Sequence, residues 1–302
     1  MKKETDSLGN RMKRYEAEAA KHDGTRDGRP VVIRLDGHKF HKWTRRMRLQ
    51  RPFDKKYVRI LQETALYLCE QIPTCVMGYC QSDEISLCLR NDQSERSEPW
   101  FGNRIQKMVS VSASKATGFF NRAVMKRLSG KLGLDTPVLA NVDFNNLPSE
   151  LSERLKEQVD RHVLGGSWKP AEIRLIPIPL AEFDSRVLFL PDLTEVVNYF
   201  IWRQGDCMSN SLSSLAQSVF DHRELHGKKA VELEEMLKSK GQGWDDLPRH
   251  LKFGTFVHKR QEQREREDIL FTRDKFFVDT ETPMFAKDKG EVERAYMFSS
   301  LF

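Results

Sequence analysis

Two aspartates at the ends of apolar, strand-like runs most constrain what this chain can fold into. Residues 31–35 alternate in a way typical of a strand, and Asp36 follows them at once. Residues 75–90 predict a strand, a tight turn and a second strand, and Asp83 lies in that turn. A carboxylate is costly to bury unless something pairs with it, so neither aspartate strengthens a core. The chain therefore needs a fold that gives both of them a role at an edge.

Helical segments separate these strands. Asp54 is a candidate cap for a helix that runs to about Gln71 with one apolar stripe, and a second helix is predicted from Pro99 to Arg127. Residues 187–190 supply a last strand. The order β-α-β-β-α-β is the ferredoxin-like pattern. We therefore expect an α+β fold that has an antiparallel sheet, helices on one face and further helical additions.

The ferredoxin-like order predicts that Asp36 and Asp83 meet. In this topology the first two strands run parallel, and the third lies between them in the opposite direction. The C-terminal end of the first strand and the turn between the second and third then share one edge of the sheet. We expect the two carboxylates to face each other there.

Facing carboxylates at a sheet edge are suited to Mg²⁺, which takes oxygen ligands and works together with phosphates. Two such ions can neutralise a triphosphate and align an attacking hydroxyl, so nucleotidyl transfer is the leading hypothesis. The candidate catalytic residues are Asp36, Asp83 and Glu84, and for Glu84 the roles of metal ligand and structural acid both stay open. Gly37 lets the backbone approach the phosphates. The plainer alternative is that both motifs are ordinary turns.

Basic residues follow the first motif directly. The segment from Lys39 to Arg51 holds six Lys or Arg side chains and no acid, and the whole chain has a net charge of +6. A polyanionic partner fits this charge. The amides from His38 to His41 and the Arg51 guanidinium are candidates to contact a triphosphate. A solvated basic surface is the alternative.

The remaining composition is typical of a cytosolic protein. The 302 residues leave room for one large domain or two ordinary ones. The five cysteines form no Cys-x-x-Cys pair and match no common zinc spacing, so we expect reduced thiols and a cytoplasmic location. No apolar run is long enough for a membrane span, and no membrane partner is expected.

The second half of the chain is less regular. Asp192 and Glu195 fit a capping box that opens a helix, residues 211–239 read as helical, and residues 258–268 form a charged run. The predicted organisation has five parts: an N-terminal helical or flexible segment (1–28), a core with the site (29–140), a variable insertion (141–182), the rest of the core with a helical region (183–260) and a C-terminal tail of unknown role (261–302).

Several ordered motifs resemble the tRNAHis guanylyltransferase superfamily, the 3′–5′ nucleotide polymerases. The segment from Arg34 to His41 comes first, Arg51 to Asp54 follows at the family's spacing, and Gln81 to Glu84 comes next. Phe183 to Arg186 resembles the family's Phe-Asp-Gly-Arg, and Tyr199 to Cys207 resembles its Trp-Arg-Gln…Asp-Cys segment.

This resemblance implies a polymerase or cyclase palm, two Mg²⁺ ions and a homotetramer. It implies that GTP or ATP activates the 5′ end of a tRNA before a nucleotide is added in the 3′–5′ direction. The implied metal ligands are Asp36, the Gly37 carbonyl and Asp83. The implied nucleotide contacts are Asp36, Gly37, His38, Lys39, Phe40, His41, Arg51, Asp54, Ser82, Asp83 and Lys107. The implied tRNA contacts are Arg45, Arg46, Arg48, Arg203 and Asn210.

Two departures from the family bear on the substrate. Arg51 replaces the family's Lys before Pro, which keeps the charge but changes its geometry. Met208 to Ser214 replaces the His-Ile-Asn-Asn-Leu-Tyr-Asn of eukaryotic guanylyltransferases, and only Asn210 and Leu212 survive. We therefore expect template-dependent repair of tRNA 5′ ends. The alternatives are a dedicated tRNAHis guanylyltransferase that adds the extra 5′ G, a nucleotide cyclase-like enzyme and a non-catalytic tRNA-binding protein.

Overall fold

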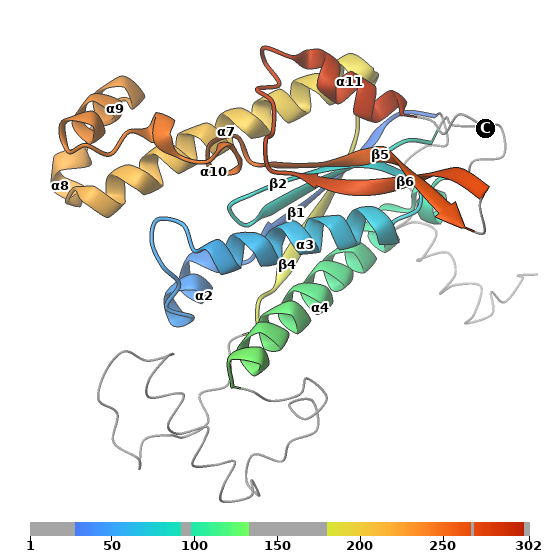
Figure 1. The fold of residues 1–302 in the computed structure, drawn as a ribbon, viewed down its shortest axis with the longest axis horizontal. Coiled ribbons are helices and arrows are strands. Elements are labelled where there is room, and N and C mark those ends of the chain that lie inside the picture. The colour runs from blue at the N-terminus through green and yellow to red at the C-terminus, as the bar shows by residue number, and fades with distance from the viewer. Residues whose placement is uncertain (1–27, 92–97, 133–179, 267–268, 299–302) are drawn as a thin grey trace, which may run out of the picture.

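The computed structural model describes residues 28–91, 98–132, 180–266 and 269–298, and these residues form a six-stranded antiparallel sheet with helices on both faces (Figure 1). The strands lie in the order β4-β1-β3-β2-β5-β6. Because β3 pairs antiparallel with both β1 and β2, those two run parallel, and the ferredoxin-like order of the first four strands is confirmed. The strands are β1 Val31–Gly37, β2 Cys75–Gln81, β3 Glu84–Leu89, β4 Phe183–Phe189, β5 Thr255–Arg266 and β6 Ile269–Asp279.

One face of the sheet is covered by α3 (Lys55–Gln71) and α4 (Ile105–Leu132). The predicted cap of α3 is confirmed, since the Asp54 side chain accepts hydrogen bonds from the amides of residues 56 and 57. The predicted helix from Pro99 is wrong at its start. A 3-10 turn, η2 (Trp100–Asn103), comes first, and its left-handed Phe101, with φ of 53°, interrupts the helical path. Between β1 and α3 lies the short α2 (Phe40–Arg46).

The expected α+β fold is confirmed, and α7 (Leu193–Val219) and α11 (Lys289–Met297) are helical additions that cover the opposite face of the sheet. Half of the predicted capping box is present at the start of α7. Asp192 accepts from the amide of Glu195 at 3.0 Å, but the Glu195 carboxylate accepts from Asn198 instead of returning to the cap.

Residues 211–239, predicted to be helical, belong to the end of α7 and to the shorter helices α8 and α9, which extend beyond the sheet (Figure 1). The helix α7 ends at Val219, and Gly227, with φ of 77°, lies in a break between α8 and α9. A small apolar cluster holds this part together. Its elements are α8 His222–Leu225, α9 Ala230–Ser239, η4 Trp244–Asp246 and α10 Arg249–Phe253.

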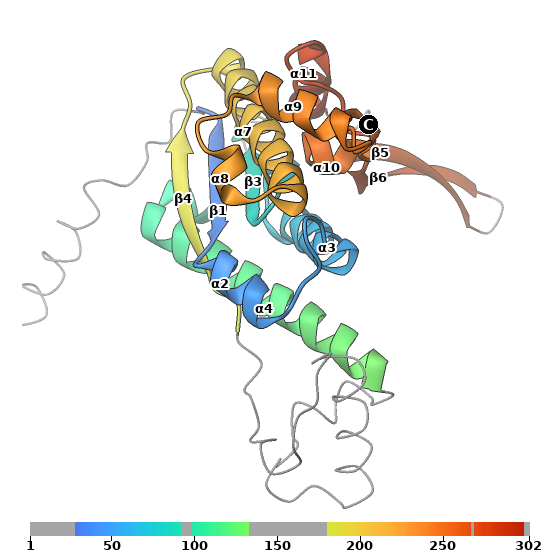
Figure 2. The ribbon, with the colours of Figure 1, turned by 90° about the vertical axis from the view of Figure 1, so that its left-hand side faces the viewer.

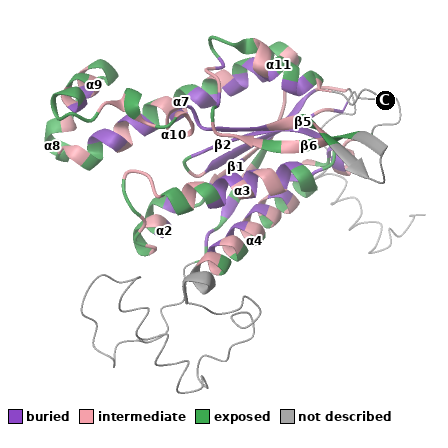
Figure 3. Ribbon diagram, viewed as in Figure 1, coloured by how far each residue is buried: buried purple, intermediate pink, exposed green. Residues whose placement is uncertain are grey.

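The boundary expected at residue 261 falls inside β5, because that strand contains the charged run from residue 258 as far as residue 266. That strand pairs with β2 on one side and with β6 along its whole length on the other. The end of the chain returns as α11, which buries Val292 and Tyr296 against α7 (Figure 3). The expected N-terminal segment and most of the insertion at 141–182 lie outside the described residues. No helix within the described ranges is long and apolar enough to cross a membrane.

Candidate functional site

The sheet brings Asp36 and Asp83 together at one edge. Asp36 is the cross-strand partner of Glu84, and the Gly37 amide donates to the Asp83 carbonyl at 3.0 Å. Burial raises the pKa of the Asp83 carboxyl, and the negative charge of Asp36 raises it further. Neither carboxylate forms an ion pair with any residue that the structure describes. Two half-buried negative charges therefore lie close together without a cation.

The turn that carries Asp83 is held by Tyr57 from α3. Ser82 has a positive φ of 51°, which is unusual for a residue other than glycine. The Tyr57 hydroxyl donates to the Ser82 carbonyl at 2.7 Å. Burial, followed by the Asp83 charge, raises the pKa of Tyr57, so the hydroxyl keeps its proton for this bond. The sequence assigned Tyr57 to an apolar helical stripe, and no signal marked its second role.

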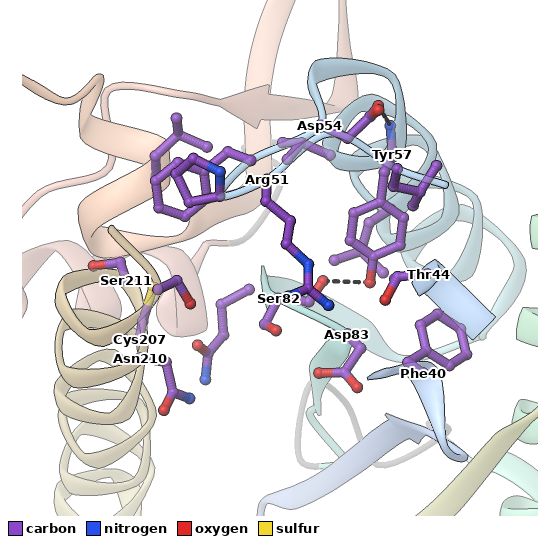
Figure 4. Close-up of a pocket in the computed structure, with 18 of the residues that line it drawn as sticks. Phe40, Thr44, Arg51, Asp54, Tyr57, Ser82, Asp83, Cys207, Asn210 and Ser211 are labelled. Carbon is purple, nitrogen blue, oxygen red and sulfur yellow. Dashed lines mark hydrogen bonds between the residues drawn. The ribbon is translucent and has the colours of Figure 1, made fainter. Parts of the chain in front are cut away.

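A pocket of about 460 Å³ opens beside this turn (Figure 4). Its size falls in the range of small-molecule sites. The Arg51 side chain extends into it toward the turn, from a loop whose Gln50 amide is held by the Asp54 carboxylate at 3.1 Å. Asp54 thus acts as a helix cap that fixes the Arg51 loop. Seven predicted residues line the pocket: Phe40, His41, Arg51, Asp54, Ser82, Asp83 and Asn210.

The far wall of the pocket comes from the second half of α7, which includes most of the segment that departs from the family pattern. The indole N–H of Trp244 donates to Ser211 at 2.9 Å and fixes this wall. The sequence marks Cys207, Ser211 and Ser214 only as parts of longer segments, and it gives no signal for the wall residues that follow them, because these come from distant parts of the chain. Those on α7 and beyond are Cys207, Ser211, Ser214, Gln217, Ser218, His250, Leu251 and Thr255.

Gly37 has a different role from the predicted one. A Cβ on Gly37 would lie 2.4 Å from the Phe40 ring, so the missing side chain makes room for that ring and not for phosphates. The Gly37 and His38 amides are already used by the carbonyls of Asp83 and Glu182. The predicted row of amides therefore shortens to residues 39–41, which belong to the first turn of α2 and lack intrahelical acceptors.

Glu84 and Arg203 pair with each other, which corrects both of their predicted roles. The guanidinium of Arg203 donates two hydrogen bonds to the Glu84 carboxylate, each at 2.7 Å, and its third nitrogen lies 2.8 Å from Asp206. The two side chains are only 8% and 10% exposed. Burial raises the pKa of Glu84, and the Arg203 charge offsets part of that rise. Glu84 is therefore occupied as a structural acid, and Arg203 is too buried to contact tRNA.

The other predicted contacts are scattered around the pocket. His38 lines a second, shallower hollow beside β4. Lys107 lies on α4 with its ammonium 5.8 Å from the centre of the Phe101 ring, and it lines neither hollow. Lys39 is exposed at the start of α2. Exposed basic residues follow at the end of α2 and just after it, namely Arg45, Arg46 and Arg48.

The donor set at the Asp36–Asp83 edge fits Mg²⁺ held in part by substrate. The described residues contain no cluster of three His, Cys, Asp or Glu side chains that could hold a metal unaided. Mg²⁺ is commonly bound by one or two carboxylates together with waters and substrate phosphates. Two neighbouring carboxylates, neither of which is in an ion pair with another described residue, match that mode of binding.

Comparisons with known proteins agree with this geometry. The family described as tRNAHis guanylyltransferase matches residues 9–149. A probable tRNA(His) guanylyltransferase of Dictyostelium discoideum is 23% identical over 81% of each chain. The tRNA(His) guanylyltransferase of Debaryomyces hansenii is 26% identical, over 60% of this chain and only 51% of its own length.

Solved structures give a fuller match. A bacterial tRNAHis guanylyltransferase-like protein in complex with ATP is 31% identical, with 97% of this chain and 100% of that chain covered and a TM-score of 0.72. A bacterial tRNAHis guanylyltransferase-like protein in complex with GTP is also 31% identical, with a TM-score of 0.68. The Saccharomyces cerevisiae enzyme is 19% identical with a TM-score of 0.54, which shows the shared fold. The chain belongs to the tRNAHis guanylyltransferase family of nucleotidyltransferases.

Proposed function

We propose that the chain adds nucleotides to the 5′ end of tRNA and uses ATP or GTP. The observation that carries this proposal is the meeting of Asp36 and Asp83 beside a pocket of nucleotide size. The ATP and GTP complexes of similar bacterial proteins support a nucleotide in that pocket. The names of the relatives support tRNA as the acceptor.

The side chains at this edge of the sheet have different roles in the proposed reaction. Asp36, the Gly37 carbonyl and Asp83 would hold Mg²⁺, which supplies charge neutralisation on a triphosphate. Arg51 and His41 line the same pocket, so they are placed to bind the outer phosphate oxygens. Tyr57 fixes the turn, and the Glu84–Arg203 pair fixes α7 against β3. The exposed basic residues of α2, Arg45 and Arg46, are candidates to bind the phosphates of the tRNA backbone.

Guanylylation of tRNAHis is the form of this activity that the relatives' names support, and it is the alternative reading of the sequence. Template-dependent repair is the second candidate. It is favoured by the pocket wall on α7, where Asn210, Ser211 and Ser214 present small polar groups. A wall with few specific polar partners discriminates less between substrates.

One assay tests the proposal and separates the two candidates. Purified protein is incubated with Mg²⁺, labelled nucleoside triphosphates, and either tRNAHis that lacks its extra G or other tRNAs that lack their first nucleotide. Guanylylation predicts that G is added to tRNAHis whatever base lies opposite. Repair predicts that the added base follows the base opposite on several tRNAs. Absence of any 5′ addition, in protein that binds ATP, would refute the proposed function.

Two further expectations accompany this function. A homotetramer predicts a solution mass near four times the 35.2 kDa of the chain, which light scattering can measure. A cytoplasmic location predicts that a tagged chain follows soluble cytosolic markers on cell fractionation. Recovery of a monomer, or of the tag with an organelle, would contradict the corresponding expectation.

A further inference from the structure

An exposed tryptophan on α7 lies beside Arg34, which precedes Asp36 by two residues in β1, and it does not line the pocket. Trp202 on α7 is 52% exposed, which is unusual for so large an apolar side chain. Its ring has the guanidinium of Arg203 at 4.4 Å and that of Arg34 at 5.7 Å from its centre. Tyr199, one turn earlier, packs edge-on against it at 5.9 Å. The indole is therefore held in place while much of it faces solvent.

Two arginines on the sheet extend this feature. Arg34 and Arg186 are direct cross-strand partners in β1 and β4, so their side chains point to the same face of the sheet. Arg186 is exposed, and its guanidinium lies 3.8 Å from the Asp184 carboxylate. Asp36 lies two residues beyond Arg34 in β1 and so points to that face as well. Trp202, Arg34 and Arg186 are called the Trp202 surface below.

The Trp202 surface and the pocket are built from different residues, and each includes or adjoins one carboxylate of the pair, Asp83 in the pocket and Asp36 two residues beyond Arg34. The pocket is lined by Asp83, by α3 and by α7 from Cys207 onward. The Trp202 surface comes from β1, β4 and an earlier turn of α7 and shares no residue with the pocket. Figure 2 shows β4 at the edge of the sheet beside β1. A reaction at the carboxylates can thus receive a triphosphate from one side and a second substrate from the other.

We propose that the Trp202 surface binds the 5′-terminal nucleotide of the tRNA acceptor. The proposal rests on the proposed function. A flat exposed ring stacks on any nucleobase, and guanidinium groups pair with phosphates, which is how single-stranded nucleic acid is commonly held. The terminal nucleotide lies at the end of the acceptor, where its base can stack on protein. Asp36 is then close to the 5′ phosphate on which the reaction takes place.

The test measures binding and does not depend on turnover. The probes are a short RNA hairpin with one unpaired 5′ nucleotide, the same hairpin without it, and ATP with Mg²⁺. Trp202→Ala is expected to weaken binding of the first hairpin by about five- to a hundredfold, because stacking on an aromatic ring contributes about 1–3 kcal/mol per base. Its affinity for ATP and for the blunt hairpin should stay near that of the wild type. Trp202→Phe, which keeps a flat ring, should recover most of the loss.

Two control variants sharpen this test. Met297→Ala removes an apolar side chain of the same 52% exposure on α11 and should leave the affinity for both hairpins unchanged. Arg186→Gln should reduce the salt dependence of hairpin binding by about 0.7–0.9 in the slope of log K against log salt, the contribution of one phosphate contact.

Three results would overturn the proposal. One is a wild-type protein with equal affinity for the two hairpins. Another is a Trp202→Ala variant that loses ATP binding but keeps hairpin binding, which would make the surface part of the nucleotide site. The third is a Trp202→Ala variant whose solution mass changes while its hairpin binding does not, which would make the surface an interface between copies of the chain. Thermal unfolding of each variant checks that it is folded. A wild type that binds the overhang but adds no nucleotide would refute the proposed function alone.

Discussion

The two faces of the sheet are held by different kinds of contact. On the α3–α4 face a large apolar and aromatic cluster makes the core, and the polar contacts, such as the Arg127–Glu63 ion pair between α4 and α3, involve partly exposed side chains. Phe120 is fully buried there, with its ring centre 5.4 Å from Trp43 and from Phe183 and 5.5 Å from Phe40. On the α7–α11 face an apolar cluster is crossed by buried polar contacts, which include the Glu84–Arg203 pair.

The polar contacts of the α7–α11 face join distant parts of the chain. The hydroxyls of Ser86 and Tyr199 lie 2.9 Å apart, and so connect β3 with α7. Gln204 donates to the carbonyls of Phe253 and Pro283 and accepts from the amide of Phe285. Buried polar groups persist when each has a partner. This explains why the Trp-Arg-Gln motif lies in α7, since its Arg and Gln attach the helix to the sheet and to the C-terminal part.

The two faces of the sheet therefore have different roles. The α3–α4 face stabilises the fold, and the α7 face carries side chains that are expected to act in the reaction. Strand alternation points Asp36 toward the α7 face, together with Arg34, while Ile33 and Leu35 point into the α3–α4 core. A change on the α3–α4 face should therefore cost stability through packing. A change on the α7 face should cost activity or leave a charge without its partner.

The largest effect is expected from removal of the carboxylates at the edge. Asp36→Asn and Asp83→Asn should each lower nucleotide addition by about a hundredfold or more, because metal ions supply several kcal/mol of transition-state stabilisation. Both variants should remain folded, since neither carboxylate has a counter-ion among the described residues. Asp192→Asn, which keeps a cap at the start of α7, is the matched control. Near-normal turnover of either variant in Mg²⁺ would refute the metal assignment.

The buried ion pair of the α7 face gives the next prediction. Arg203→Met should lower the free energy of unfolding by about 3–5 kcal/mol, because it leaves Glu84 charged and buried without its partner. The double variant Glu84→Met with Arg203→Met should recover most of this loss, since an apolar pair can replace a buried ion pair at little cost. Denaturant unfolding measures both. A double variant that is as unstable as the single one would mean that packing around Arg203, and not charge, holds α7.

The α3–α4 face should behave differently under the same test. Phe120→Ala should also lower the free energy of unfolding by about 3–5 kcal/mol, through loss of buried surface and the cavity left among the neighbouring rings. No charge is involved, so this loss should not change with salt. Turnover per folded molecule should stay close to that of the wild type. A loss of turnover much larger than the loss of folded protein would show that this face also shapes the site.

The sequence predicted the part of the site that depends on local pattern and strand order. Alternation, the Asp54 cap and the β-α-β-β-α-β order together placed Asp36 and Asp83 at one edge. The sequence did not predict roles that depend on a contact with another segment of the chain. For Glu84 the sequence leaves the roles of metal ligand and structural acid both open, because its partner Arg203 lies 119 residues further along the chain. Gly37 looked like a phosphate contact because the position of the Phe40 ring depends on tertiary packing.

The C-terminal part was mispredicted for a related reason. Residues 258–268 carry many charges, which is typical of a solvated segment. The structure shows that residues 258–266 belong to β5, where the Arg260 guanidinium lies 4.0 Å from the Phe277 ring centre and 2.8 Å from Asp279 of β6. Side chains whose charges pair across two strands do not produce the alternation of apolar and polar residues by which a single strand is recognised in the sequence. The same limit applies to Tyr57, because its hydroxyl meets its acceptor, the Ser82 carbonyl, only in the folded structure.

Tyr57 gives the smallest and sharpest prediction, since it belongs to the α3–α4 face but reaches the edge where the chemistry takes place. Tyr57→Phe keeps the ring among Phe40, Trp43 and Phe120 and removes only the hydrogen bond to Ser82. One neutral hydrogen bond contributes about 0.5–1.5 kcal/mol, so turnover should fall about two- to twelvefold. The Mg²⁺ concentration needed for half-maximal rate should rise, because the freed turn no longer fixes Asp83. Tyr67→Phe removes a hydroxyl from the same helix, where the ring stacks on Phe119 at 4.3 Å, and should change neither quantity. If Tyr57→Phe lowers stability but leaves turnover and the Mg²⁺ requirement as they are, Tyr57 belongs to the supporting face alone.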